Sequence, residues 1–86
     1  MYIVILQSKA EKFLKKLPKD IQKRIIEKLK ELKEKPEMGV PLTANLTGLW
    51  KLRIGDYRAI YVIRKSELTI FVIRIGHRKN IYHEKT

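Results

Sequence analysis

The hydrophobic residues of this chain change their spacing near its middle, and this change restricts the folds open to it. Between residues 8 and 35 the apolar residues recur every three or four positions, which is typical of amphipathic helices. From Leu49 to Ile75 they alternate with polar residues or form short β-branched runs, which is typical of strands. A chain that separates its helices from most of its strands in this way is expected to have an α+β fold.

The first half of the chain is predicted to form one strand and a pair of helices. A β-branched and aromatic run at 2–6 indicates the strand. Ser8 and Glu11 have the spacing of a capping box, which indicates that a helix begins there. Pro18 suits the first turn of a second helix, because that position needs no N–H donor. This second helix is predicted to run to about Lys35.

The second half is predicted to form three strands after a loop. Pro36 ends the second helix, and 36–48 is expected to be the loop. Turns at Gly55-Asp56 and Lys65-Ser66 divide the remainder into strands at 49–54, 57–64 and 68–75. The element order is therefore β-α-α-β-β-β. We predict a mostly antiparallel four-stranded sheet with the N-terminal helical hairpin on one face.

Length and composition exclude several classes of protein. A chain of 86 residues can enclose only one core, so a single domain over 1–86 is expected. There is no cysteine, and two histidines without suitably spaced carboxylates are too few for zinc, so no metal site is expected. No apolar run approaches the roughly 18 residues of a membrane span, and no glycine-rich phosphate loop or serine-hydrolase signature occurs. No cofactor is expected, and the cytoplasm is the expected location.

The charge of the chain indicates the kind of partner that it binds. Twenty lysines and arginines against nine acidic residues leave a formal net charge of +11. A field of this size attracts polyanions, and binding to nucleic acid would release counterions. A lysine-rich solubilising surface would have the same composition, so charge alone leaves both interpretations open.

Pairing the strands on either side of Gly55-Asp56 places the basic residues. Arg53 then lies opposite Arg58, and Lys51 lies two residues along the same face. The other face is apolar enough to cover the helices. Like charges in directly opposed positions destabilise a strand pair, and a bound anion would relieve the repulsion. Alternatively, these side chains splay into water or pair with the acidic residues Asp56 and Glu84.

The end of the last strand is expected to bring more basic residues to the same rim. That strand runs antiparallel to 57–64, so it ends beside Arg53 and Arg58, and Gly76 lets the chain bend there. Arginine suits phosphate oxygens, and tyrosine or histidine can stack on an unpaired base. The predicted RNA-binding residues are Lys51, Arg53, Arg58, His77, Arg78, Lys79 and His83. The acid–base groups in reach are Tyr82, His77, His83 and lysine.

Two segments resemble the RelE/ParE toxin superfamily, and the likeness extends over essentially the whole chain. The first is Leu49-Trp50-Lys51-Leu52-Arg53-Ile54-Gly55-Asp56-Tyr57-Arg58-Ala59-Ile60-Tyr61, and the second is Ile75-Gly76-His77-Arg78 ahead of Ile81-Tyr82. The resemblance implies a toxin of a type II toxin–antitoxin system. RelE-like members cut mRNA in the ribosomal A site through attack of a ribose 2′-hydroxyl, whereas ParE-like members inhibit DNA gyrase without cutting RNA.

The resemblance also implies roles for individual residues. Lys51 and Arg53 match the family's two basic positions before the turn. Arg58 matches the arginine that the family places at the scissile phosphate, and Arg78 matches the arginine near the leaving oxygen. Tyr82 resembles the tyrosine that stacks on the base or takes the proton, with His83, His77 or a lysine as alternatives.

The basic pair before the turn favours a ribosome-dependent endoribonuclease that inhibits translation over the alternative of a non-enzymatic gyrase inhibitor. The implied partners are the ribosome, mRNA and a cognate antitoxin, acidic or amphipathic, that wraps the domain.

Overall fold

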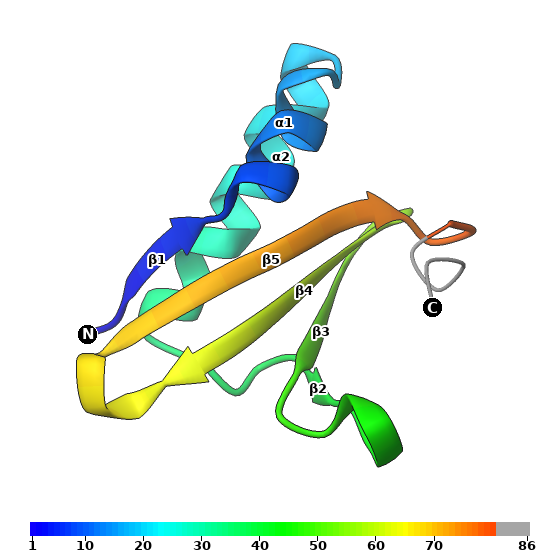
Figure 1. Cartoon of the computed structure of the whole chain (residues 1–86). Helices are drawn as coiled ribbons and strands as arrows, with labels where there is room; N and C mark the ends of the chain where they lie inside the picture. Colours follow the sequence, from blue (N-terminus) through cyan, green and yellow to red (C-terminus); the bar gives the residue numbers. More distant parts are fainter. Residues whose placement is uncertain (81–86) are drawn as a thin grey trace.

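The computed structural model describes residues 1–80, and its element order is that of a strand, two helices and a β-meander (Figure 1). Three short 3-10 segments, at Glu31–Lys33, Ala44–Leu46 and Lys65–Glu67, join the main elements. The helices and strands are β1 (Ile3–Leu6), α1 (Ser8–Lys15), α2 (Lys19–Lys30), β2 (Val40–Pro41), β3 (Trp50–Ile54), β4 (Tyr57–Arg64) and β5 (Thr69–His77).

The strands form a single five-stranded sheet in the order β1-β5-β4-β3-β2. β1 pairs with β5 in parallel, and the other pairs are antiparallel. The α+β class is confirmed, and each of the four strands expected from the sequence is present. The sheet has five strands, however, so the predicted number of four was wrong. The fifth strand, β2, lies inside the segment that was expected to be a loop. It has only two residues, and Pro41 lacks an N–H donor, which sheets tolerate at an edge.

The two helices differ from the sequence prediction at their ends. α1 begins at Ser8, so Gln7 holds the capping position, and no side chain caps the helix there. The capping box was therefore wrong. Pro18 holds the capping position of α2, one residue before its first turn. α2 ends at Lys30 and continues as the 3-10 segment rather than as α-helix to Lys35.

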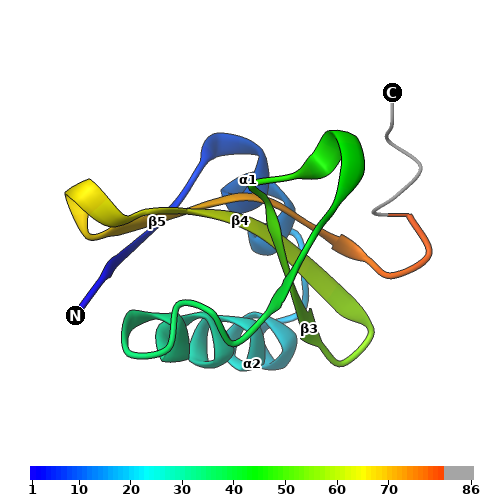
Figure 2. The ribbon, with the colours of Figure 1, turned by 90° about the horizontal axis from the view of Figure 1, so that it is seen from below.

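Both helices cover the same face of the sheet. Figure 2 shows the sheet curving over α2. The helices contribute four residues to the buried core, including Ile25, and the 3-10 segment after α2 adds Leu32; Ile25 and Leu32 are fully buried. The sheet contributes side chains from alternate positions of β3 and β4 and from β5, as a period of two requires. The face opposite the helices is therefore the one on which polar and basic side chains can collect. The core residues are Ala10, Leu14, Ile25, Leu29, Leu32, Leu52, Ile54, Ala59, Tyr61, Ile70, Val72 and Ile75.

Tyr61 fixes the segment that leads into β2. Its ring is fully buried and stacks on Trp50, with ring centroids 6.2 Å apart. Its hydroxyl donates to the carbonyl of Pro36 at 2.7 Å and accepts from the N–H of Gly39 at 3.2 Å. A Cβ at Gly39 would lie 2.6 Å from the carbonyl oxygen of Lys51, so only glycine allows the segment to approach β3 this closely.

We predict that Tyr61→Phe lowers the free energy of unfolding by about 1–3 kcal/mol, because the partly buried carbonyl of Pro36 and N–H of Gly39 lose their hydrogen-bond partner. Burial also raises the pKa of Tyr61, so the fold favours the neutral phenol. The stability that depends on this group should be complete below pH 10 and lost as the pH rises through the raised pKa. Denaturation followed by Trp50 fluorescence at pH 7 and at alkaline pH would measure both effects. Tyr2→Phe is the control, and equal losses in the two variants would contradict the prediction.

Candidate nucleic-acid interface

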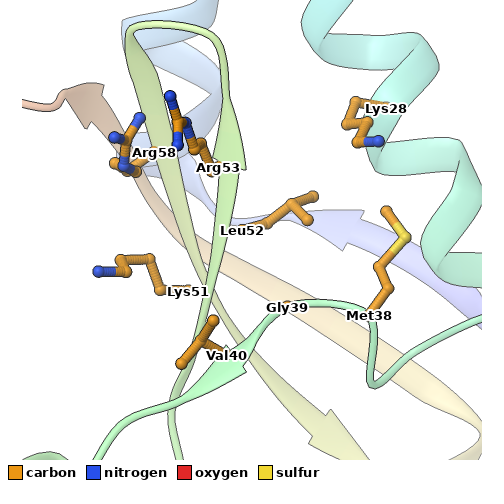
Figure 3. A pocket seen from close by; sticks show the side chains of 8 residues that line it. All are labelled: Lys28, Met38, Gly39, Val40, Lys51, Leu52, Arg53 and Arg58. Carbon is orange, nitrogen blue, oxygen red and sulfur yellow. The ribbon is translucent and has the colours of Figure 1, made fainter.

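The β3–β4 hairpin gathers three basic side chains on the face away from the helices. Its register pairs Arg53 with Arg58 and Lys51 with Ile60, as predicted from the two-residue turn. Gly55 has a φ of +60° in that turn, a conformation that glycine adopts without strain. Residues at alternate positions share a face, so Lys51, Arg53 and Arg58 lie on one side of the hairpin (Figure 3). We call these three residues the basic cluster.

Within the basic cluster, Arg58 is held in place by the backbone of the turn. Its Nη1 donates to the carbonyl of Gly55 at 2.8 Å and to that of Tyr57 at 2.9 Å. Arg58 is half-buried, whereas Arg53 opposite it is exposed. The two bonds engage one terminal nitrogen and fix the plane of the guanidinium. A guanidinium whose orientation is already fixed loses less entropy when it binds a phosphate.

Arg78 lies at the same end of the sheet as the arginines of the basic cluster. Gly76 pairs with Arg58, which brings the end of β5 next to the turn. The N–H of Arg78 donates to the carbonyl of Asp56 at 2.8 Å, and its Nε lies 3.9 Å from a carboxylate oxygen of the same residue. The side chains of Arg78 and Asp56 are both more than half exposed, so this ion pair contributes little to the stability of the fold. Arg78 can therefore exchange Asp56 for a phosphate at small cost.

His77 lies on the other face of the sheet. It pairs with Tyr57, one residue before Arg58, and its ring centroid is 5.6 Å from that of Tyr57. Tyr57 in turn contacts Phe13 of α1, with ring centroids 6.2 Å apart. Nδ1 of His77 accepts from the N–H of Lys79 at 3.2 Å, and Lys79 is exposed. The strand therefore brings His77 to the predicted rim but not to the face of the basic cluster.

Three residues named from the sequence, Tyr82, His83 and Glu84, lie outside the described residues, so their predicted roles stay predictions. Within residues 1–80, no group of three or more histidine and carboxylate side chains could hold a metal ion. In the same part of the chain, neither helix is long and apolar enough to cross a membrane.

A groove of about 460 Å³ opens beside the basic cluster. It extends from the cluster over the outer edge of β3 to α2 (Figure 3). Sequence reasoning missed its far wall, because it named no site residue on the second helix and expected 36–48 to be a loop. The spacing of apolar residues along α2 indicates which face of the helix is polar. It does not indicate which strand lies beside that face. The lining residues are Lys28, Met38, Gly39, Val40, Lys51, Leu52, Arg53 and Arg58.

The opposed arginines of the hairpin should reduce stability measurably. We predict that Arg53→Gln raises the free energy of unfolding by about 0.2–1 kcal/mol at low salt, because it removes like-charge repulsion with Arg58. The gain should shrink as added salt screens the two charges. Denaturant unfolding at low and high ionic strength measures the difference. Arg64→Gln, a matched change at the exposed far end of β4, is the control. A loss of stability in Arg53→Gln would contradict the repulsion.

Comparison with known proteins identifies relatives over nearly the whole chain. A family model described as the ParE toxin of type II toxin–antitoxin systems, parDE, matches residues 4–82. Toxin RelG of Mycobacterium tuberculosis is 34% identical over 83 residues, which are 94% of this chain and 95% of RelG.

Solved structures agree with the sequence relatives. The toxin–antitoxin complex RelBE2 from Mycobacterium tuberculosis contains a chain with a TM-score of 0.83 and 33% identity, covering 90% of this chain and 98% of that one. The archaeal RelE–RelB complex from Pyrococcus horikoshii contains a chain with a TM-score of 0.72 and 28% identity. The match covers 90% of the present chain and 94% of the archaeal one.

Proposed function

Because this chain belongs to the RelE/ParE superfamily of type II toxins, we propose that it is a ribosome-dependent endoribonuclease that cuts mRNA in the A site. The observation that carries the proposal is the basic cluster of Lys51, Arg53 and Arg58 on one face of the sheet, with Arg78 at the same end. A strand pair bears two directly opposed arginines most readily when an anion occupies the space between them.

The proposed reaction is an internal transfer at one phosphodiester. The ribose 2′-oxygen attacks the adjacent phosphorus, the bond from phosphorus to the 5′-oxygen breaks, and the products are a 2′,3′-cyclic phosphate and a 5′-hydroxyl. Arg58 and Arg53 face the phosphate and stabilise the additional negative charge of the pentavalent transition state. Arg78, beside the turn, stabilises the charge that develops on the leaving oxygen.

The proton transfers are assigned to residues that follow β5 in the sequence or to a lysine. Tyr82, His83 and Lys51, the lysine of the cluster, are the candidates for the group that takes the 2′-proton, and a proton from water completes the 5′-hydroxyl. His77 is disfavoured, because its ring contacts Tyr57 on the helix face. A site that acts mainly through electrostatic groups gains most from a partner that orients the substrate, and we assign this part to the ribosome.

An antitoxin is the proposed regulator. The solved relatives include complexes of RelE-type toxins with RelB antitoxins. A chain with a net charge of +11 would attract an acidic or amphipathic antitoxin that wraps the domain and neutralises the basic cluster. Since the proposed substrate is mRNA on ribosomes, we propose the cytoplasm as the place of action.

Primer extension on purified ribosomes tests the proposal. A programmed ribosome with an open A site is incubated with the protein, and the message is mapped with and without ribosomes. We expect a cut in the A-site codon that requires the ribosome. Intact message in both reactions would contradict the proposed activity.

Inhibition of DNA gyrase is the second candidate function, and the match to the ParE family model favours it. A gyrase inhibitor acts without ribosomes and leaves RNA intact. A supercoiling assay with purified gyrase separates the two candidates. Loss of supercoiling together with intact message would replace the nuclease by the inhibitor.

A further inference from the structure

We propose that the groove over the outer edge of β3 carries the RNA chain away from the basic cluster, with Lys28 and Arg24 of α2 as additional phosphate contacts. The inference rests on the proposed RNA substrate and extends it to a second wall of the site. It concerns two residues of a helix that the proposed reaction does not use.

The groove exists because β2 is short. Val40 and Pro41 pair with Lys51 and Trp50, so β2 covers only the first two residues of β3. Beyond that point the groove extends over the edge of β3 to α2, where Lys28 lines it. Figure 3 shows the side chain of Lys28 on α2, across the groove from β3.

Arg24 extends the basic wall of α2 toward the turn. It precedes Lys28 by four residues, so the two side chains lie one helical turn apart on the same side of α2. Its Nη1 lies 3.8 Å from the position that a Cβ would take at Gly55. α2 therefore presents cations from the groove up to the tip of the hairpin that holds Arg58.

The charge of the groove selects a polyanion. Its lining includes Lys28 and the basic cluster but no carboxylate. Nζ of Lys28 lies 3.5 Å from Glu31, and both side chains are about half exposed, so this ion pair is weak. Lys28 can turn to a phosphate without leaving a buried charge behind.

The shape of the groove selects a chain rather than a single ion. Lys28 lies on the helix side of β3, whereas Lys51, Arg53 and Arg58 point to the other side of the strand (Figure 3). A ligand that contacts both groups therefore passes over the edge of the strand. A single RNA strand can do so, because it carries a negative charge at every nucleotide and can bend over this edge.

The test measures how the affinity for a short and a longer single-stranded RNA depends on salt. The RNAs carry 2′-O-methyl groups so that they cannot be cut, and binding is measured by fluorescence anisotropy without ribosomes. Lys28→Gln should weaken binding of the longer RNA by about three- to tenfold and reduce the slope of log K against log salt by about 0.7. Lys28→Gln with Arg24→Gln should reduce the slope by about 1.4. The short RNA, which reaches only the basic cluster, should change little.

Lys30→Gln is the matched control, because Lys30 is an exposed lysine of the same helix that does not line the groove. It lowers the net charge equally and should leave the slope unchanged. Equal slopes for Lys28→Gln and the wild type would overturn the inference. The inference would also be overturned if Lys28→Gln left the salt slope for RNA unchanged but weakened the binding of an acidic peptide. That result would assign the groove to a protein partner. Ribosomal cleavage by the wild type is scored separately, so the proposed nuclease activity can fail while the RNA groove stands, or the reverse.

Discussion

Arg58→Ala is expected to lower the rate of mRNA cleavage on ribosomes by about 10²–10³-fold, the usual effect of removing one positioned donor from a charged transition state. The guanidinium of Arg58 is fixed by two bonds from Nη1 to turn carbonyls, so its orientation is set before substrate arrives. The same bonds mean that the variant loses about 1 kcal/mol of stability, which is too little to unfold the protein at assay temperature.

The measurement is single-turnover cleavage of a programmed message at saturating protein, together with denaturant unfolding of each variant. Arg64→Ala is the control, because Arg64 is an exposed arginine at the opposite end of β4. A cleavage rate for Arg58→Ala within a few-fold of that for Arg64→Ala would remove Arg58 from the proposed mechanism.

Arg78→Ala is expected to lower the single-turnover rate by about 10²-fold with almost no effect on folding, because the side chain is exposed and its contact with Asp56 is long. If Arg78 stabilises the leaving oxygen, its loss should matter less when that oxygen is a better leaving group. A message with a bridging 5′-sulfur at the cut site supplies one.

The deficit of Arg78→Ala should therefore shrink sharply on the sulfur-containing message, while the deficit of Arg58→Ala persists. Lys79→Ala, which removes the neighbouring exposed cation, is the control. An equal deficit of Arg78→Ala on both messages would assign Arg78 to binding rather than to the leaving group.

The register of the basic cluster could be predicted from sequence because one local signal fixes it. A two-residue turn at Gly55-Asp56 leaves a single way to pair the flanking strands, so Arg53 had to oppose Arg58. The same pairing made the other face of the hairpin apolar, and Trp50 and Tyr61 stack on that face. Local turn chemistry and a period of two were sufficient at these positions.

The face of His77 could not be predicted, because it depends on an irregularity between β4 and β5. The register shifts between Ile60 and Tyr61, so β5 has one additional residue at this point. Even-numbered residues such as Val72 face the core before the shift, and odd-numbered residues such as Ile75 face it afterwards. No residue pattern in the sequence indicates this bulge, which changes the face of every later side chain.

The groove wall and β2 were missed for a different reason. β2 has two residues, one of them proline, and its position depends on the close approach of Gly39 to β3 and on the buried hydroxyl of Tyr61. These contacts join Gly39 to residues 12 and 22 positions later in the chain. Periodicity reports only on neighbours within one element, so it cannot reveal which helix side chain lies opposite a strand edge.

The central claim is that the basic cluster holds a phosphodiester while its own 2′-hydroxyl attacks it. The most direct measurement uses two ribosome-bound messages that differ only in a single 2′-deoxy sugar at the cut position, with the ends of any product identified. We predict that the all-ribose message yields a 2′,3′-cyclic phosphate and a 5′-hydroxyl, and that the 2′-deoxy message stays intact. Cutting of both messages, or of neither, would contradict the claim.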